Sequence, residues 1–144
     1  MVETLRQYYE EYDAKATEVR KKSSFFANFF GTGESANRHP CHEAFYEKVE
    51  AKMKEFVDSQ PDPAAAAEVC TFLLEAPIPY KKNEKDSYWF MYVCVGMIRS
   101  LVPFLTQEDC VALSEKMGVL YKKKDRMPVQ AEAYKMLCKK AKGK

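Results

Sequence analysis

Apolar side chains recur every three or four residues along most of this chain, the spacing that places them on one face of an α-helix. The clearest stripe consists of Leu5, Tyr8, Tyr9, Tyr12, Ala16 and Val19, with charged residues opposite. It predicts an amphipathic helix over residues 3–30, ended by Gly31 and Gly33, because glycine favours a helix C-terminal cap. No run alternates with the period of two that a half-buried β-strand shows, so we expect an all-α protein.

Prolines divide the next part of the chain into helical segments. Pro40 suits the first turn of a second helix after a loop. Asp62 can cap a third helix that has Pro63 at its first position, and Pro77 prevents this helix from continuing. Its expected buried face consists of Ala66, Val69, Cys70, Leu73 and Leu74. The two helices predict a hairpin over residues 40–76.

Residues 88–98 are an uninterrupted run of eleven apolar or glycine residues. We interpret this run as a central helix surrounded by its neighbours, with Gly96 permitting one of them to come close. Arg99 and Pro103 interrupt it well short of the roughly 20 apolar residues that cross a bilayer. No membrane span is therefore expected.

Capping signals define the last two helices. Thr106 and Asp109 have the spacing of an approximate capping box, which predicts a fifth helix and, with the preceding apolar run, a second hairpin over residues 87–117. Pro128 can start a basic C-terminal helix over residues 128–141. The expected apolar side of that helix consists of Ala133, Leu137 and Ala141.

The 144 residues are enough for one hydrophobic core of ordinary size and favour a single domain, 1–144. We expect about six helices, in an irregular helical bundle or a short stack of helical hairpins. The two hairpins match weakly at an offset of 40 residues, which places Cys70 on Cys110 and Leu73 on Leu113. Stacked helical pairs repeat at about this length, and the sequence leaves open whether this is a true repeat.

The cysteines and the N-terminus favour a cytoplasmic protein. Five cysteines are an odd number, and most lie among apolar residues, which is typical of reduced, buried thiols. The segment 1–6 is polar and lacks the apolar stretch of a secretory signal.

One cluster of ligand-type side chains consists of His39, Cys41 and His42. Imidazole and thiolate bind zinc and other soft metals, but such a site needs three or four converging ligands. We favour the alternative, a helix-capping segment with one or two exposed imidazoles. No cofactor is expected, and no catalytic residue stands out.

A basic and aromatic segment follows the first apolar stripe. Its candidate partner-binding or surface-binding residues are Lys21, Lys22, Phe25, Phe26, Phe29 and Phe30. Helices that dock into a groove or lie on a membrane surface use this combination. The simpler interpretation is that four phenylalanines at helical spacing pack into the protein's own core.

Residues 122–144 carry a local net charge of +7, whereas the rest of the chain sums to −5. The candidate anion-binding residues are Lys122, Lys123, Lys124, Lys139 and Lys140. Lysines on a terminal helix equally serve solubility and the helix dipole.

Motifs of known chemistry do not stand out in this sequence. It has no Gly-rich phosphate loop after a strand, no GxSxG or HExxH and no Cys/His finger. We therefore expect a non-catalytic helical module that contacts a protein partner, an inference from fold type alone. The second hypothesis is a small-molecule-dependent or metal-dependent enzyme that uses residues 39–42. Binding of nucleic acid or an anionic surface through the basic segments ranks third, and the partner and oligomeric state remain open.

Overall fold

The computed structural model describes residues 1–30, 35–81 and 85–143, with side chains at 1–18, 41–81 and 88–143. Within these ranges the chain has six α-helices, four 3₁₀ segments and no strand. The prediction of an all-α fold with about six helices is confirmed.

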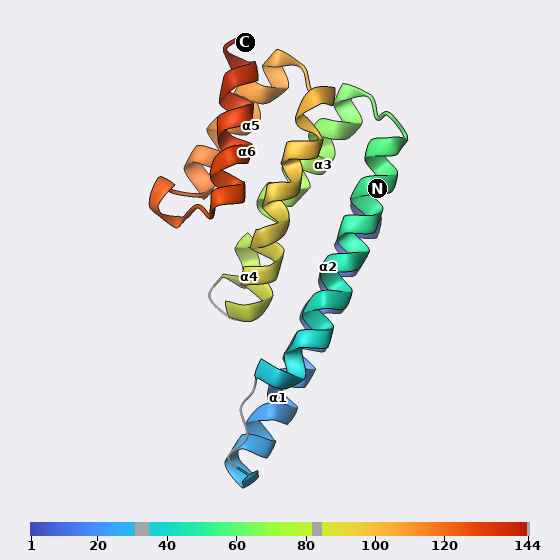
Figure 1. Cartoon of the computed structure of the whole chain (residues 1–144), viewed down its shortest axis with the longest axis vertical. Helices are drawn as coiled ribbons and strands as arrows, with labels where there is room; N and C mark the ends of the chain where they lie inside the picture. Colours follow the sequence, from blue (N-terminus) through green and yellow to red (C-terminus); the bar gives the residue numbers. More distant parts are fainter. Residues whose placement is uncertain (31–34, 82–84, 144) are drawn as a thin grey trace.

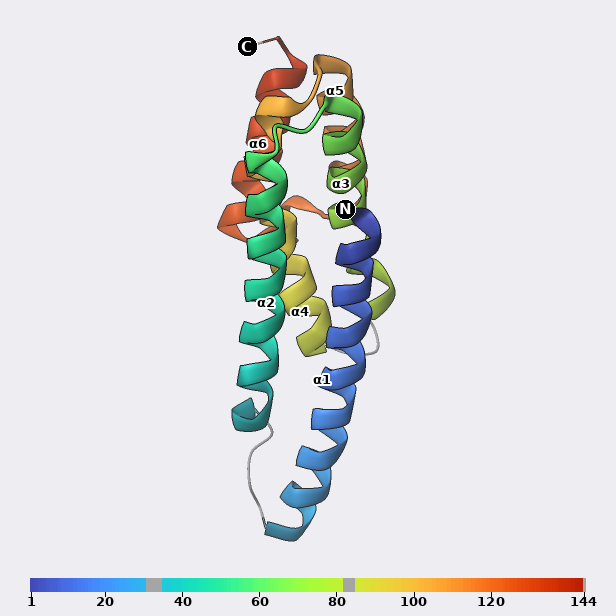
Figure 2. The same ribbon diagram turned by 90° about the vertical axis from the view of Figure 1, so that its right-hand side faces the viewer.

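Helices α1 (Val2–Phe30) and α2 (Ser35–Asp58) lie antiparallel and form the longest hairpin of the molecule (Figures 1 and 2). The end where α1 leads into α2 projects beyond the other helices in both views. The predicted start of α2 near Pro40 is wrong, because the helix already begins at Ser35. A proline inside a helix lacks the N–H that bonds to the fourth preceding carbonyl, and here that loss falls close to the helix start.

Helix α3 (Pro63–Glu75) follows the predicted chemistry closely. The carboxylate of Asp62 accepts a hydrogen bond from the Ala65 amide at 2.8 Å, and Pro63 occupies the first helical position. The buried residues of α3 are the five that the sequence predicted, Ala66, Val69, Cys70, Leu73 and Leu74. Local capping and the 3.6-residue period together account for this helix.

The expected central helix is α-helical only in its first part. Helix α4 (Lys85–Val93) passes into the 3₁₀ segments η2 (Cys94–Ser100) and η3 (Val102–Phe104). Gly96 does permit a close neighbour, because a Cβ atom built there would lie 3.0 Å from Cγ2 of Val129. The segment is not covered on all sides, since Trp89 is 49% exposed.

Helices α5 (Gln107–Leu120) and α6 (Pro128–Ala141) complete the fold. The capping box is confirmed, because Thr106 and Asp109 exchange backbone-to-side-chain hydrogen bonds, both at 3.0 Å. Pro128 is the first residue of α6, as predicted. Ala133 and Leu137 have no exposed surface.

The packing of these helices differs from the expected hairpins over 40–76 and 87–117. Helix α2 packs chiefly against α1, α5 packs chiefly against α6, and α3 contacts α5 and η2. Figure 1 shows α3 and α4 in the middle, between the α1–α2 pair and the α5–α6 pair. Apolar faces therefore meet across the molecule as well as between neighbours in sequence.

The offset of 40 residues matches buried positions but not helix starts. Cys70 and Cys110 have no exposed surface, and their helices, α3 and α5, pack against each other. The caps Asp62 and Thr106 are 44 residues apart, one helical turn more than the offset. The two helices thus begin at different places relative to the matched cysteines.

Four of the five cysteines are buried, the fifth, Cys138, is partly exposed, and none forms a disulfide. The predicted burial is confirmed for those four. Among the described residues, no helix has the length and apolar character needed to cross a membrane.

Candidate functional site

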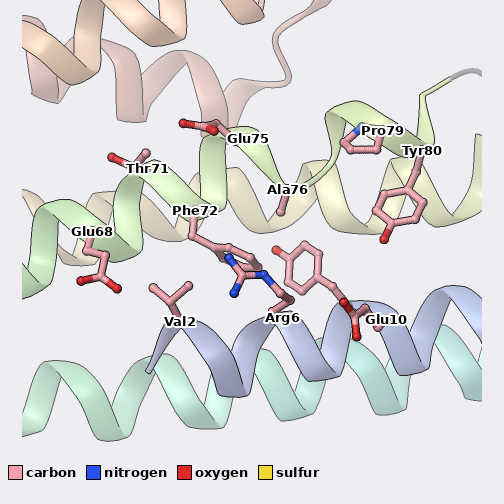
Figure 3. A pocket seen from close by; sticks show the side chains of 11 residues that line it. Val2, Arg6, Glu10, Glu68, Thr71, Phe72, Glu75, Ala76, Pro79 and Tyr80 are labelled. Atoms are coloured by element: carbon pink, nitrogen blue, oxygen red, sulfur yellow. The ribbon is translucent and has the colours of Figure 1, made fainter.

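The candidate site is an open groove between the first turns of α1 and the C-terminal part of α3, extended by the 3₁₀ turn η1 (Ile78–Tyr80) (Figure 3). We call it the α1–α3 groove, and its volume is about 610 Å³. Its floor is largely apolar and includes Val2, Tyr9, Phe72, Ala76 and Tyr80. Its charged residues are Arg6, Glu10, Glu68 and Glu75.

Tyr9 holds the aromatic floor in place. Its ring packs edge-on against Phe72 of α3, with the centroids 5.2 Å apart, and against Phe45 of α2, with the centroids 5.1 Å apart. Burial, and to a smaller extent the neighbouring Cys94 thiol, raises the pKa of Tyr9 well above its usual value. The phenol therefore stays neutral and acts as a structural support for the exposed side of Phe72.

Arg6 covers the ring of Phe72. Its guanidinium carbon lies 5.6 Å from the ring centroid, within the range of a cation–π interaction. Arg6 also donates a hydrogen bond to the carboxylate of Glu3. Among the described residues that line the groove, Arg6 is the single basic side chain.

The carboxylates of the groove are not equivalent. Glu75 accepts a hydrogen bond from Lys116 Nζ at 2.6 Å and points away from α1 (Figure 3). Glu10 and Glu68 are exposed, and within the part of the chain whose side chains are described neither forms an ion pair. They lie towards opposite ends of the groove, on either side of Arg6 (Figure 3).

Two carboxylates, those of Asp13 and Glu10, lie near the end of the groove that contains Tyr80. The phenol of Tyr80 points towards α1 in Figure 3. Its pKa is raised from its usual value by burial, by Asp13 and by Glu10, in that order. Two carboxylates thus act on the same hydroxyl, which marks a place that favours positive charge.

A second groove lies between α2, η2 and α6 and has a volume of about 570 Å³. We call it the methionine groove, because Met53, Met97 and Met136 line it. Its charges are mixed: Arg99 pairs with Glu132 at 3.0 Å, and one further acidic and one further basic residue lie along it.

The predicted ligand cluster is only partly described. His39 lies outside the described side chains, whereas Cys41 and His42 are both buried. The imidazole of His42 stacks on Phe90 with the ring centroids 4.1 Å apart, so His42 is not one of the one or two imidazoles expected to be exposed. Burial raises the pKa of the Cys41 thiol. No three His, Cys, Asp or Glu residues of the described part form a metal-binding group, and the role of the complete cluster stays a prediction.

The other predicted site residues fall into two sets. The side chains of Lys21, Lys22, Phe25, Phe26, Phe29 and Phe30 belong to α1 but lie outside those that are described. The basic residues at 122–124 precede α6, whereas Lys139 and Lys140 lie in its last turn, about 20 Å away along a helix of this length. Lys140 already donates hydrogen bonds to two backbone carbonyls, at 3.0 and 3.2 Å. The structure does not bring these lysines together.

Buried thiols offer no activated nucleophile. Burial raises the pKa of Cys70 and of Cys94 to about 12, so both stay protonated at neutral pH. Nucleophilic cysteines have the opposite property, a lowered pKa in a partly exposed position.

Sequence reasoning missed the α1–α3 groove. Arg6, Phe72 and Tyr80 come from three separate elements, and no short motif joins them. Two weak signals exist: Phe72 lies beside the buried stripe of its helix, and Tyr80 is an aromatic residue in a connection rich in proline and lysine.

No family model, no curated protein and no solved structure matches this chain. The fold and the groove define an all-α protein with an open aromatic groove that is edged by carboxylates.

Proposed function

We propose that this protein is a non-catalytic helical module that binds a segment of a partner protein in the α1–α3 groove. The observation that carries the proposal is the half-buried ring of Phe72 on the floor of an open groove. Aromatic side chains in such positions dominate the binding energy of many protein interfaces.

The packing of side chains around the groove favours ligand binding over catalysis. Tyr9 fixes Phe72 relative to α1 and α2, so a ligand meets a surface that is already formed. The volume of about 610 Å³ accommodates a few side chains of a partner segment. The buried thiols described above lack the lowered pKa that nucleophilic catalysis uses, which also supports a binding role.

A cytoplasmic location belongs to the same proposal. Five cysteines without a disulfide fit a reducing compartment, where thiols remain free. A single compact surface for nucleic acid gains no support from lysines that lie at opposite ends of α6.

Selection of binding peptides from a random library tests the proposal, followed by fluorescence anisotropy with the purified full chain. We expect the selected peptides to lose at least about tenfold in affinity when Phe72 is replaced in Phe72→Ala. The matched control is Phe104→Ala, which removes a half-buried phenylalanine outside the groove. Circular dichroism shows whether each variant is folded. Failure to select any peptide, or equal losses in both folded variants, contradicts the proposal.

A further inference from the structure

We infer that the segment bound in the α1–α3 groove is cationic, and that Arg6 holds the place of a partner lysine or arginine in the free protein. This inference rests on the proposed function and specifies its partner. It makes Arg6 an internal competitor for the face of Phe72.

Arg6 lies over the face of Phe72 that a partner cation would contact. A guanidinium 5.6 Å from the centroid of Phe72 shows that this ring face accepts a cation. The Arg6 side chain is 48% exposed, so it can leave the ring without opening the core. The ring itself stays in place, since Tyr9 supports it from the side.

The carboxylates around Phe72 also favour a cationic ligand. Glu10 and Glu68 flank the ring face and have no ion-pair partner among the described side chains. Glu3 is paired with Arg6 and becomes available when Arg6 leaves. Asp13 adds a further carboxylate near Tyr80, at the same end of the groove as Glu10. A basic segment with apolar neighbours complements both the charges and the floor.

The methionine groove provides a comparison within the same molecule. Its lining contains Glu50 and Lys54 in addition to the pair between Arg99 and Glu132, so its charges balance. The methionine groove therefore has no charge preference for either a basic or an acidic partner segment. The preference for a cation is thus a property of the α1–α3 groove.

The test uses three labelled peptides that share the same leucine positions and carry Lys, Gln or Glu between them. We expect the lysine peptide to bind the full chain most tightly and the glutamate peptide most weakly. Glu10→Gln and Glu68→Gln should each weaken the lysine peptide by about twofold to fivefold and leave the glutamine peptide unchanged. Added salt should reduce these differences, because exposed charges are screened.

Arg6→Gln distinguishes competition from simple attraction. We expect it to strengthen binding of the lysine peptide by about threefold or more, since the variant uncovers Phe72. Lys48→Gln is the matched control, because it removes an exposed positive charge that lies outside this groove. In the double variant Arg6→Gln, Phe72→Leu the gain should disappear. Binding of the lysine peptide should also shift the NMR signal of the Arg6 side chain, which lies over the ring in the free protein.

The outcomes separate the two proposals. Equal binding of all three peptides, or weaker binding of the lysine peptide by Arg6→Gln, overturns the inference and leaves the binding function standing. Equal gains in Arg6→Gln and Lys48→Gln also overturn it, because net charge alone then explains the effect. Absence of binding by all three peptides, together with failure of the library selection, overturns both.

Discussion

Gln130 donates a hydrogen bond from Nε2 to the carbonyl oxygen of Tyr92 at 2.9 Å, while its Oε1 accepts one from the Met127 amide at 2.6 Å. The side chain of Gln130 has no exposed surface. One buried amide therefore satisfies the first turn of α6 and a backbone carbonyl of α4 at the same time. Groups of this kind are costly to leave without partners inside a core.

Replacing Gln130 with alanine should lower the free energy of unfolding by about 2–4 kcal/mol, because a buried carbonyl and a partly buried amide lose their partner. Urea titration followed by circular dichroism measures the change. Gln107→Ala is the control, since Gln107 donates to the Ala141 carbonyl at 3.0 Å in an exposed position. Its loss should be below about 1 kcal/mol. Similar losses in the two variants would show that burial does not decide the strength of these bonds.

Adding a methyl group at Gly96 should destabilise the contact between η2 and α6. The new Cβ would lie 3.0 Å from Cγ2 of Val129, closer than ordinary packing allows. We expect Gly96→Ala to cost about 1–2 kcal/mol, after the smaller entropy gain from replacing glycine. The double variant Gly96→Ala, Val129→Ala should recover part of the loss in the same urea assay. A loss that the second substitution leaves unchanged would place the strain in the backbone instead.

The thiols should react in the order of their exposure. Cys138 is partly exposed, whereas Cys70 and Cys94 are fully buried and have pKa values raised to about 12 by burial. At neutral pH we expect a disulfide reagent to modify Cys138 rapidly and these two only after unfolding. Cys138→Ser should remove the fast phase, as absorbance shows. Rapid modification of Cys70 in the native protein would contradict its burial.

The free energy of unfolding should fall at alkaline pH, over a range determined by the pKa of Tyr92. Burial, followed by Tyr88 and Asp125, raises the pKa of Tyr92 from 10.0 to about 12. Between these values the unfolded chain releases the proton and the folded chain keeps it, so stability falls as pH rises from about 10 to about 12. Tyr92→Phe should make this fall less steep, although it loses the 2.6 Å hydrogen bond to the Asp125 carbonyl. Urea midpoints measured across the window give the two slopes, and identical slopes would refute the assignment.

Features that depend on neighbours in sequence could be predicted. Asp62 with Pro63, and Thr106 with Asp109, cap their helices because the partner groups lie within one turn. The buried face of α3 follows from the helical period alone, as do Ala133 and Leu137 of α6, whereas the buried Gln130 was missed and Ala141 is only partly buried.

Features that depend on contacts between distant segments were not predicted correctly. The change from α to 3₁₀ winding after Val93 has no local signal, and the expected close neighbour of Gly96 could be identified as Val129 of α6 only from the structure. The partners of α2 and α3 are chosen by three-dimensional packing, which the positions of prolines do not specify. The α1–α3 groove was missed for the same reason, since Arg6 and Phe72 meet only in the folded chain.

The pairing of α1 with α2 and of α5 with α6 also bears on which helices come together first during folding. Each pair joins helices that follow one another in sequence, so closing the loop between them costs little entropy. Contacts between such neighbours form quickly, and either end of the chain can assemble while the other is still extended. The segment η2 packs against α2, α3 and α6, and it can settle only when both ends are present. We therefore expect substitutions in the end pairs to slow folding, and substitutions in η2 mainly to speed unfolding.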